Sequence, residues 1–216
     1  GKIASLDINE ALAMPGVVRI FMAKDIPGEN QIGGIVPDEE LLASSYVHFC
    51  GMPLALVVAE TEEAARAAVK KVKVTIEPLP VITHPREDKE KGELIIPPRT
   101  FRLGDTSSVG KDCDHIIEGR TETNGQEHLY IETQGAYAVP QENGAIRIYS
   151  STQGPTAVQR TAARVLAIPM NQIEVDTTRL GGGFGGKEDQ ATTWGVMCAL
   201  AAFHLKRPVK YCLHRM

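Results

Sequence analysis

The chain has 216 residues, of which 43% are hydrophobic and 23% are charged, and its formal net charge is −4 at pH 7. These are the values of an ordinary globular protein of one or two domains. A net negative charge gives no reason to expect nucleic acid as a partner. The longest apolar runs, Pro53–Ala59 and Trp194–Phe203, are far shorter than the roughly 20 residues that cross a bilayer, so we expect no membrane partner.

The four cysteines show neither a C-x-x-C pair nor the spacing of a zinc or iron–sulfur site: they are Cys50, Cys113, Cys198 and Cys212. Cys198 lies in an apolar run, where a free cysteine usually belongs to the core. The sequence opens without a signal-peptide pattern. We therefore expect the protein in the cytoplasm, where thiols stay reduced.

The first 80 residues alternate strand and helix patterns. Strands are predicted at Lys2–Ile8, Val17–Ala23, Leu54–Ala59 and Val72–Pro78, each with apolar residues at alternating or continuous positions. A helix is predicted over Thr61–Lys71, with Thr61 placed to cap its first turn. This mixture indicates an α+β or α/β fold for the first domain, which we assign to residues 1–83.

The composition changes after residue 83. The run Pro85–Gly92 is almost entirely charged, and Pro97-Pro98 follows it. Such a run is usually a solvated connection, so residues 84–113 are interpreted as a linker and residues 114–216 as a second domain.

The second domain begins with strand patterns, at Ile116–Thr123, Leu129–Val139 and Ala145–Ser151. Asn143-Gly144 is a strong signal for a hairpin turn between the last two. Gly154–Leu166 is predicted to be a helix, with its proline suited to the first turn. The strands and helices together predict layered α/β structure.

One stretch organises this second domain. A short strand from Ile173 leads into the sequence GGGFGGKE at 181–188, and an apolar helix runs on to Leu205, followed by a strand at Pro208–Leu213. Glycines allow positive φ angles and close approach of other groups. A glycine loop before a helix also turns backbone N–H groups toward one point, which favours an anion.

Two nucleotide-binding patterns almost fit this loop. Gly181, Gly183 and Gly186 match G-x-G-x-x-G, but no Asp or Glu follows between residues 190 and 216 to bind a ribose. The loop also matches the start of a P-loop, but Glu188 stands where Ser or Thr must bind magnesium. A nucleotide-binding α/β module stays open as an alternative.

Three separated parts of the sequence resemble one known family. The first is TRLGGGFGGKE at Thr178–Glu188 with RPVKYCLHR at Arg207–Arg215. The second is GQEHLYIET at Gly125–Thr133. The third, weaker, is Leu12–Val17 followed by Lys24–Gly28. These motifs resemble those of the xanthine dehydrogenase/aldehyde oxidase family of molybdenum hydroxylases, and the resemblance covers nearly the whole chain.

The resemblance implies an α/β hammerhead domain, truncated at its N-terminal end, followed by the first part of a molybdenum-cofactor-binding domain, truncated at its C-terminal end. It implies an oxidoreductase with molybdenum–molybdopterin, and with iron–sulfur clusters and FAD on other domains or subunits. The family hydroxylates heterocycles or aldehydes with oxygen taken from water. Its general-base glutamate and substrate-binding arginine belong to later sequence. We therefore expect the 216 residues to be inactive alone and to need the rest of the molybdenum-binding subunit.

The same resemblance suggests roles for individual residues. Gln126 corresponds to the glutamine that hydrogen-bonds a molybdenum oxygen ligand, and Phe184, between Gly183 and Gly185, to the loop residue whose backbone approaches the molybdenum centre. Glu188 corresponds to the substrate-orienting glutamate of xanthine dehydrogenases, which favours purines because an aldehyde offers no N–H to bind. An aldehyde oxidase-type enzyme is the alternative.

Each of these residues also has a structural interpretation. Gln126 would be a polar residue at a strand end, Phe184 a hydrophobic plug, and Glu188 an acidic residue in the first turn of a helix. Glu132 is expected to be a structural partner of another side chain. Gln153 could reach the cofactor region from its place at the end of a strand.

Overall fold

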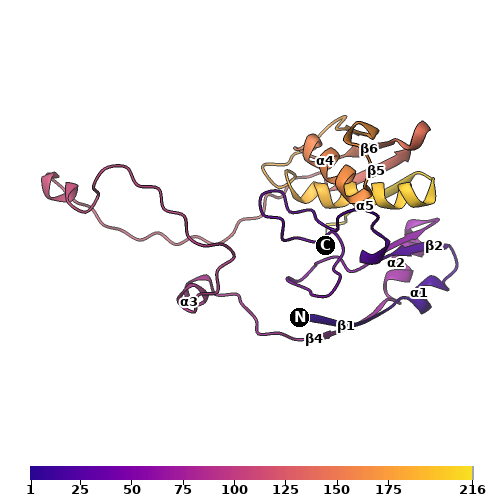
Figure 1. Cartoon of the computed structure of the whole chain (residues 1–216), viewed down its shortest axis with the longest axis horizontal. Helices are drawn as coiled ribbons and strands as arrows, with labels where there is room; N and C mark the ends of the chain where they lie inside the picture. Colours follow the sequence, from indigo (N-terminus) through magenta and orange to yellow (C-terminus); the bar gives the residue numbers. More distant parts are fainter. Residues whose placement is uncertain (216) are drawn as a thin grey trace. The chain divides into compact units, whose positions relative to one another are not determined.

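The computed structural model describes residues 1–215, which form two compact units. The first joins Gly1–Leu79 to the residues from His128 onward, and the second is Pro80–Glu127. Figure 1 shows the chain coloured along its sequence. The domain boundaries at 83/84 and 113/114 stay a prediction.

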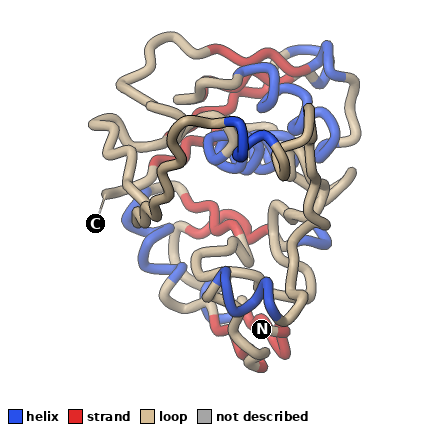
Figure 2. Tube along the Cα trace, turned by 90° about the vertical axis from the view of Figure 1, so that its left-hand side faces the viewer, coloured by secondary structure: helices blue, strands red, loops and turns tan. Residues whose placement is uncertain are grey.

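The first 79 residues form two small antiparallel strand pairs with two helices. Their elements are β1 (Lys2–Asp7), α1 (Asn9–Leu12), β2 (Val17–Phe21), a 3-10 turn (Ala23–Asp25), β3 (Leu56–Ala59), α2 (Glu62–Val69) and β4 (Lys73–Glu77). Strand β1 pairs with β4, and β2 pairs with β3. Both pairs are separate from the larger sheet of the same unit (Figure 2).

Helix α2 begins as its sequence predicts. The Thr61 hydroxyl accepts a hydrogen bond from the backbone N–H of Ala64 at 3.2 Å, which satisfies one of the free donors of the first turn. The helix then buries Ala68 against Ala11 of α1 and Ile20 of β2. This is a small core, built mostly from alanines.

The residues from His128 onward build a four-stranded sheet with two long helices. Its elements are β5 (Gly135–Pro140), a 3-10 turn (Glu142–Gly144), β6 (Ile146–Ser150), α4 (Pro155–Leu166), a 3-10 turn (Met170–Gln172), β7 (Ile173–Asp176), α5 (Gln190–Leu205) and β8 (Val209–Cys212). The strand order is β7-β6-β5-β8, with β6 and β7 parallel and the other pairs antiparallel. The predicted hairpin turn is confirmed, since Asn143 and Gly144 both take positive φ, 58° and 80°.

The main core lies between this sheet and the helices α4 and α5. Ile146 and Ile148 of β6 are at most 2% exposed, and α5 runs alongside β5 and β6 (Figure 1). Burying side chains of this size contributes about 1.5–3 kcal/mol each. Gly195 lets the two helices approach closely, because a Cβ there would lie 2.9 Å from Cγ1 of Val158. The predicted core position of Cys198 is confirmed at 1% exposure.

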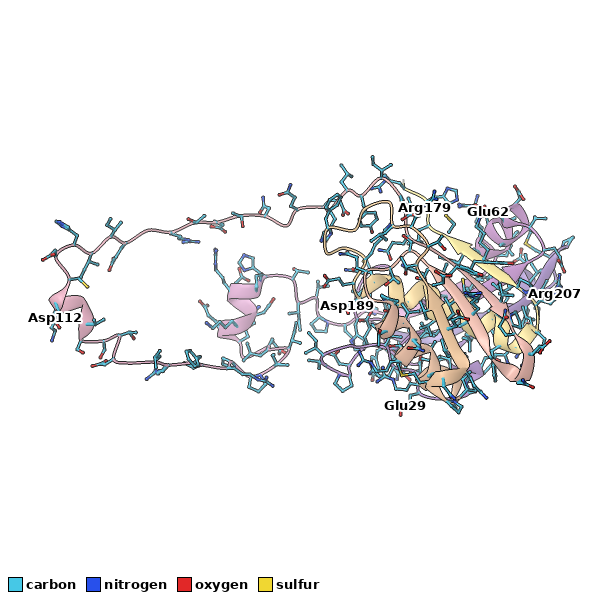
Figure 3. All side chains as sticks on the ribbon, turned by 90° about the horizontal axis from the view of Figure 1, so that it is seen from above. Glu29, Glu62, Asp112, Arg179, Asp189 and Arg207 are labelled. Atoms are coloured by element: carbon cyan, nitrogen blue, oxygen red, sulfur yellow. The ribbon has the colours of Figure 1, made fainter. Side chains whose placement is uncertain are left out.

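Side-chain and backbone bonds tie the first 79 residues to this core. Arg207, just past α5, forms a two-pronged ion pair with Glu60 at 2.9 and 2.8 Å. The Gly28 N–H donates to the carbonyl of Val165 in α4 at 2.9 Å. These contacts explain why the two parts form one unit. Asp189 and Arg207 flank the two ends of α5 (Figure 3).

The second unit has little regular structure. It contains α3 (Pro85–Glu90) and a 3-10 turn (Val109–Asp112), the site of the labelled Asp112 (Figure 3). The charged run is solvated as predicted, since Asp88 is its one buried residue, but part of it forms the short helix α3. Asp88 accepts the His84 N–H at 2.8 Å. The strand predicted at Ile116–Thr123 is wrong. No strand of this unit pairs with that segment in the described structure, and Ile117 is 94% exposed.

The strand predicted at Leu129–Val139 is also too long, since β5 begins only at Gly135. Leu129 has a positive φ of 48°, which an extended strand does not allow. Glu132 bonds the loop before α5 and so lies outside the sheet ladder. Among the described residues, no helix is long and apolar enough to cross a membrane.

Candidate functional site

The glycine-rich segment Gly181–Lys187, here called the glycine loop, connects the end of β7 to the start of α5. Gly182 and Gly185 have φ angles of 92° and 90°, which favour glycine, and Phe184 between them has φ 51°. Phe184 is 75% exposed, whereas Lys187 on the same loop is 0% exposed. The loop therefore turns its one aromatic side chain outward and its one cationic side chain inward.

The side chain of Gln153 fills the inside of the glycine loop. Its Oε1 accepts the N–H of Gly185 at 3.0 Å and the N–H of Lys187 at 3.2 Å. Its backbone N–H donates to the Lys187 carbonyl at 2.8 Å. A Cβ on Gly183 would collide with the Gln153 amide and lie 2.6 Å from its Cδ. Gly183 is thus needed to leave room for Gln153.

The carboxylate of Glu132 joins the two ends of the loop. Its Oε2 accepts the Gly181 N–H at 2.9 Å and the Lys187 Nζ at 2.8 Å. The Ser151 hydroxyl donates to the same oxygen at 2.6 Å and accepts from Lys187 Nζ at 2.7 Å. Partial burial acts to raise the pKa of Glu132, but the hydrogen bonds from Lys187, Ser151 and Gly181 outweigh it and leave the pKa below its usual value.

Three further side chains pack against the far end of the loop. The Lys187 Nζ lies 4.6 Å from the ring centre of Tyr130, a cation–π contact. Gln134 Nε2 donates to the Tyr130 hydroxyl at 2.8 Å and to the Gly186 carbonyl at 3.2 Å. A Cβ on Gly186 would lie 2.7 Å from Cε1 of Tyr130 and 2.9 Å from Cγ of His128. The loop is therefore held on all its inner sides by specific groups.

These bonds decide which loop N–H groups are left for a ligand. The N–H groups of Gly181, Gly185 and Lys187 are already taken by Glu132 and Gln153. Within the described residues, no acceptor bonds the N–H of Gly183 or Phe184 at the loop tip. A phosphate cradle needs several free N–H groups and an outward lysine. The buried Lys187 and the occupied donors argue against the nucleotide-binding alternative.

Comparison with known proteins identifies the family. Residues 1–80 match the model of the aldehyde oxidase and xanthine dehydrogenase a/b hammerhead domain, and residues 85–216 match that of the molybdopterin cofactor-binding domain. The chain belongs to the xanthine dehydrogenase/aldehyde oxidase family. The expected fold class, hammerhead domain followed by a molybdenum-cofactor-binding domain, is confirmed.

Individual members of the family cover the whole chain. It is 39% identical over 214 residues to a xanthine dehydrogenase of Dictyostelium discoideum and 40% identical over 216 residues to aldehyde oxidase 2 of Cavia porcellus, in both cases over 99% of this chain. The aldehyde oxidoreductase of Desulfovibrio gigas superimposes with a TM-score of 0.87 at 29% identity, over 99% of this chain and 25% of that one. The chain spans 16% of the length of the first two relatives.

The glycine loop of this molybdopterin cofactor-binding domain offers donors that suit an anionic group with oxygen acceptors. The unbonded N–H groups of Gly183 and Phe184 carry no charge and sit on a loop whose φ angles and internal bonds fix their direction. The Lys187–Glu132 pair adds no net charge beside them. When bound, the molybdenum cofactor of this family supplies the redox centre.

The residues predicted for the site lie in different surroundings. Gly183, Phe184 and Gly185 form the tip of the glycine loop. Glu188 is exposed and lies before the helix, because Asp189 is the residue that precedes the first turn of α5. The interpretation of Glu188 as a first-turn helix charge is therefore wrong. Gln126 belongs to the second unit, exposed and outside any helix or strand, and its approach to molybdenum stays a prediction.

Other residues of the site follow from the structure and not from the motif. The expected structural role of Glu132 is confirmed by its bonds to Gly181 and Lys187. Gln153 bonds the glycine loop, and its reach toward the cofactor stays a prediction. The sequence patterns did not predict the bonds of Lys187 and Ser151 to the Glu132 carboxylate. A lysine between glycines and an apolar helix is a signal that could have been read, since a cation in such a place needs a carboxylate partner.

Proposed function

We propose that this chain supplies part of the molybdenum-cofactor site of a xanthine dehydrogenase-like hydroxylase, which oxidises purines or related heterocycles with oxygen from water. The observation that carries the proposal is the exposed carboxylate of Glu188, directly after the glycine loop, whose tip has unbonded N–H groups. Among the described residues, no side chain or backbone donor bonds this carboxylate. It is thus free to accept a hydrogen bond from a substrate.

Each residue has a part in this proposal. The N–H groups of Gly183 and Phe184 donate to an oxygen acceptor of the cofactor. For Gln126 we propose, from its sequence motif alone, a neutral amide donor to a molybdenum oxygen ligand. A neutral donor stabilises such an oxygen without bringing a competing charge. Glu188 accepts from ring N–H groups of a purine and so orients the heterocycle.

The complete enzyme of this proposal has further parts. Iron–sulfur clusters and FAD on other domains or subunits carry the electrons away, and the rest of the molybdenum-binding subunit completes the substrate site. Residues 1–216 alone are then inactive. We place the enzyme in the cytoplasm, and the free thiols of this chain are compatible with that compartment.

The proposal is tested with Glu188→Gln in the full-length enzyme. Losing a charge-assisted contact should cost about 1.5–3 kcal/mol of transition-state stabilisation for a purine, which lowers its kcat/KM roughly 10- to 150-fold. The kcat/KM for an aldehyde should be nearly unchanged. Asp189→Asn is the matched control, since it removes the neighbouring exposed carboxylate. Equal losses on both substrates for Glu188→Gln would contradict the purine assignment.

An aldehyde oxidase-type hydroxylase is the second candidate. The 40% identity to aldehyde oxidase 2 and the superposition on the aldehyde oxidoreductase of Desulfovibrio gigas support it to the same degree as the xanthine dehydrogenases. The carboxylate of Glu188 favours the purine proposal, because it has nothing to bind on an aldehyde. Faster turnover of aldehydes than of purines by the unmodified enzyme would favour the second candidate.

A further inference from the structure

We propose that Lys187 is a positioning residue, whose buried ammonium fixes the glycine loop in the form that presents the Phe184 N–H. The proposal rests on the proposed function only for its effect on turnover. Its structural part depends on the loop geometry alone. No role in binding substrate or cofactor directly is assigned to Lys187, which is 0% exposed.

The first argument is that one oxygen atom closes the loop. Oε2 of Glu132 accepts the N–H of Gly181 at the start of the loop and the Nζ of Lys187 at its end. The chain between them contains five residues, four of them glycines, which have the largest conformational freedom to lose. A loop of this composition needs fixed ends to hold one conformation.

The second argument concerns the inner side of the loop. The backbone N–H of Lys187 is bound by Gln153, and its side chain by Glu132 and Ser151. These three partners come from segments just before β5 and just after β6, so the loop end is held to the edge of the sheet from two directions. In the part of the chain that the structure describes, the N–H of the tip residue Phe184 has no such bond, so its direction depends on these supports.

The third argument is electrostatic. Glu132 brings a carboxylate to the loop, where an anionic ligand would be repelled by an unpaired negative charge. The Lys187 ammonium, 2.8 Å away, neutralises it inside the protein. Tyr130 adds the face of its ring at 4.6 Å from the same ammonium. The loop thus carries its neutral N–H donors on a neutral support.

The test uses the full-length enzyme, with and without cofactor, and the variants Lys187→Met, Glu132→Gln and the double variant. Hydrogen–deuterium exchange is measured on a peptide covering 179–189, with the α4 peptide 155–166 as internal reference. Breaking the pair should raise exchange in the loop peptide by about tenfold or more and leave α4 unchanged. The double variant relieves the cost of an unpaired charge but still lacks the bonds of the ammonium, so its loop should exchange more slowly than in Glu132→Gln and faster than in the unmodified enzyme.

Turnover and metal content give a second readout. Lys187→Met should lower kcat and the molybdenum bound per chain, because the loop N–H groups are no longer held in one direction. Arg207→Met, which breaks the exposed pair with Glu60, is the matched control and should alter neither loop exchange nor metal content. If the unmodified enzyme holds no molybdenum, the proposed function fails while the exchange data still test the loop.

Two results would overturn the proposal. One is unchanged loop exchange in Lys187→Met, and the other is an equal rise in the loop and α4 peptides, which marks a general loss of stability. Should Lys187→Met fail to fold, Ser151→Ala removes one bond to the ammonium without leaving a charge unpaired. It should raise loop exchange to a smaller extent, and no rise there would count equally against the proposal.

Discussion

The Nζ of Lys187 lies 2.8 Å from Oε2 of Glu132, although the lysine is fully buried and the glutamate side chain is 42% exposed. The two charges therefore do not depend equally on each other. Without Lys187, the carboxylate can still be solvated by water. Without the Glu132 carboxylate, the partners that the ammonium keeps among residues 1–215 are the Ser151 hydroxyl and the Tyr130 ring.

This asymmetry predicts that Glu132→Gln destabilises the loop more than Lys187→Met. Removing one partner of a buried pair costs about 3–5 kcal/mol, and the exposure of Glu132 places this pair near or below the lower end of that range. Native-state hydrogen exchange of the loop amides gives the free energy of opening for each variant. A larger effect for Lys187→Met would show that the carboxylate, and not the ammonium, is the costly unpaired charge.

The loop should also lose stability in acid. The pKa of Glu132 in the folded chain lies below its ordinary value of 4.5. A group with a lowered pKa contributes stability above its unfolded pKa, and that contribution is lost as the pH falls through the folded value. Loop exchange relative to α4 should therefore rise as the pH drops below about 4.5.

Glu132→Gln is the control for this acid effect. Its amide does not titrate in this range, so the difference in loop protection between the unmodified enzyme and this variant should shrink as the pH falls below about 4.5. The groups in contact with the carboxylate are the Lys187 ammonium, the Ser151 hydroxyl and the Gly181 N–H, of which only the ammonium is charged. A difference that stays constant down to pH 3 would contradict the assignment to Glu132.

The parts of the fold with strong local signals could be predicted from the sequence. Asn143-Gly144 predicts its hairpin because both residues tolerate positive φ, and Thr61 predicts the start of α2 because its hydroxyl can accept from the first turn. The helix α5 follows from an apolar run that is too long for a strand. In each of these elements, neighbouring residues alone determine the structure.

The errors come from segments whose structure depends on distant partners. Ile116–Thr123 alternates like a strand, but alternation has meaning only where a neighbouring strand pairs with it. The stretch before Gly135 looks extended, yet Glu132 is drawn to Gly181, 49 positions away. In the same way, the motif GGGFGGKE shows that a tight loop is present but does not reveal that Lys187 points inward. That direction is set by Glu132 and Ser151.

Gly183 and Gln153 should behave as a coupled pair. In Gly183→Ala the new Cβ displaces the Gln153 side chain, so the N–H groups of Gly185 and Lys187 lose their acceptor. The N–H of buried Lys187 is then left unbonded at a cost of about 1–3 kcal/mol, whereas exposed Gly185 can turn to water and costs less. Gln153→Ala loses the same two bonds directly. The double variant should therefore be little worse than either single one, since the same bonds are lost only once.

The free energy of loop opening is measured for the two single variants and the double variant, again by native-state hydrogen exchange. Gly119→Ala is the matched control, because a Cβ at Gly119 meets nothing within 4 Å and its φ is not positive. Fully additive losses from Gly183→Ala and Gln153→Ala would show that the two residues act independently.

Cys198 should be chemically inert in the native protein. Its thiol is 1% exposed, and burial raises its pKa to about 12. Thiol reagents attack the thiolate, which is scarcely present at pH 8 with such a pKa. The Sγ also donates to the Ala136 carbonyl of β5 at 3.4 Å, which ties α5 to the sheet.

Iodoacetamide labelling at pH 8 checks this, with the peptide that contains Cys198 followed by mass spectrometry. The native full-length enzyme should leave this peptide unlabelled over hours, and labelling should become complete after denaturation in urea. The reagent reaches the Cys198 thiol only when α5 opens. The rate of labelling in the native protein should therefore fall under conditions that stabilise the core. Labelling of the native enzyme within minutes would show that α5 opens readily and that its packing against β5 is weaker than the burial of Cys198 implies.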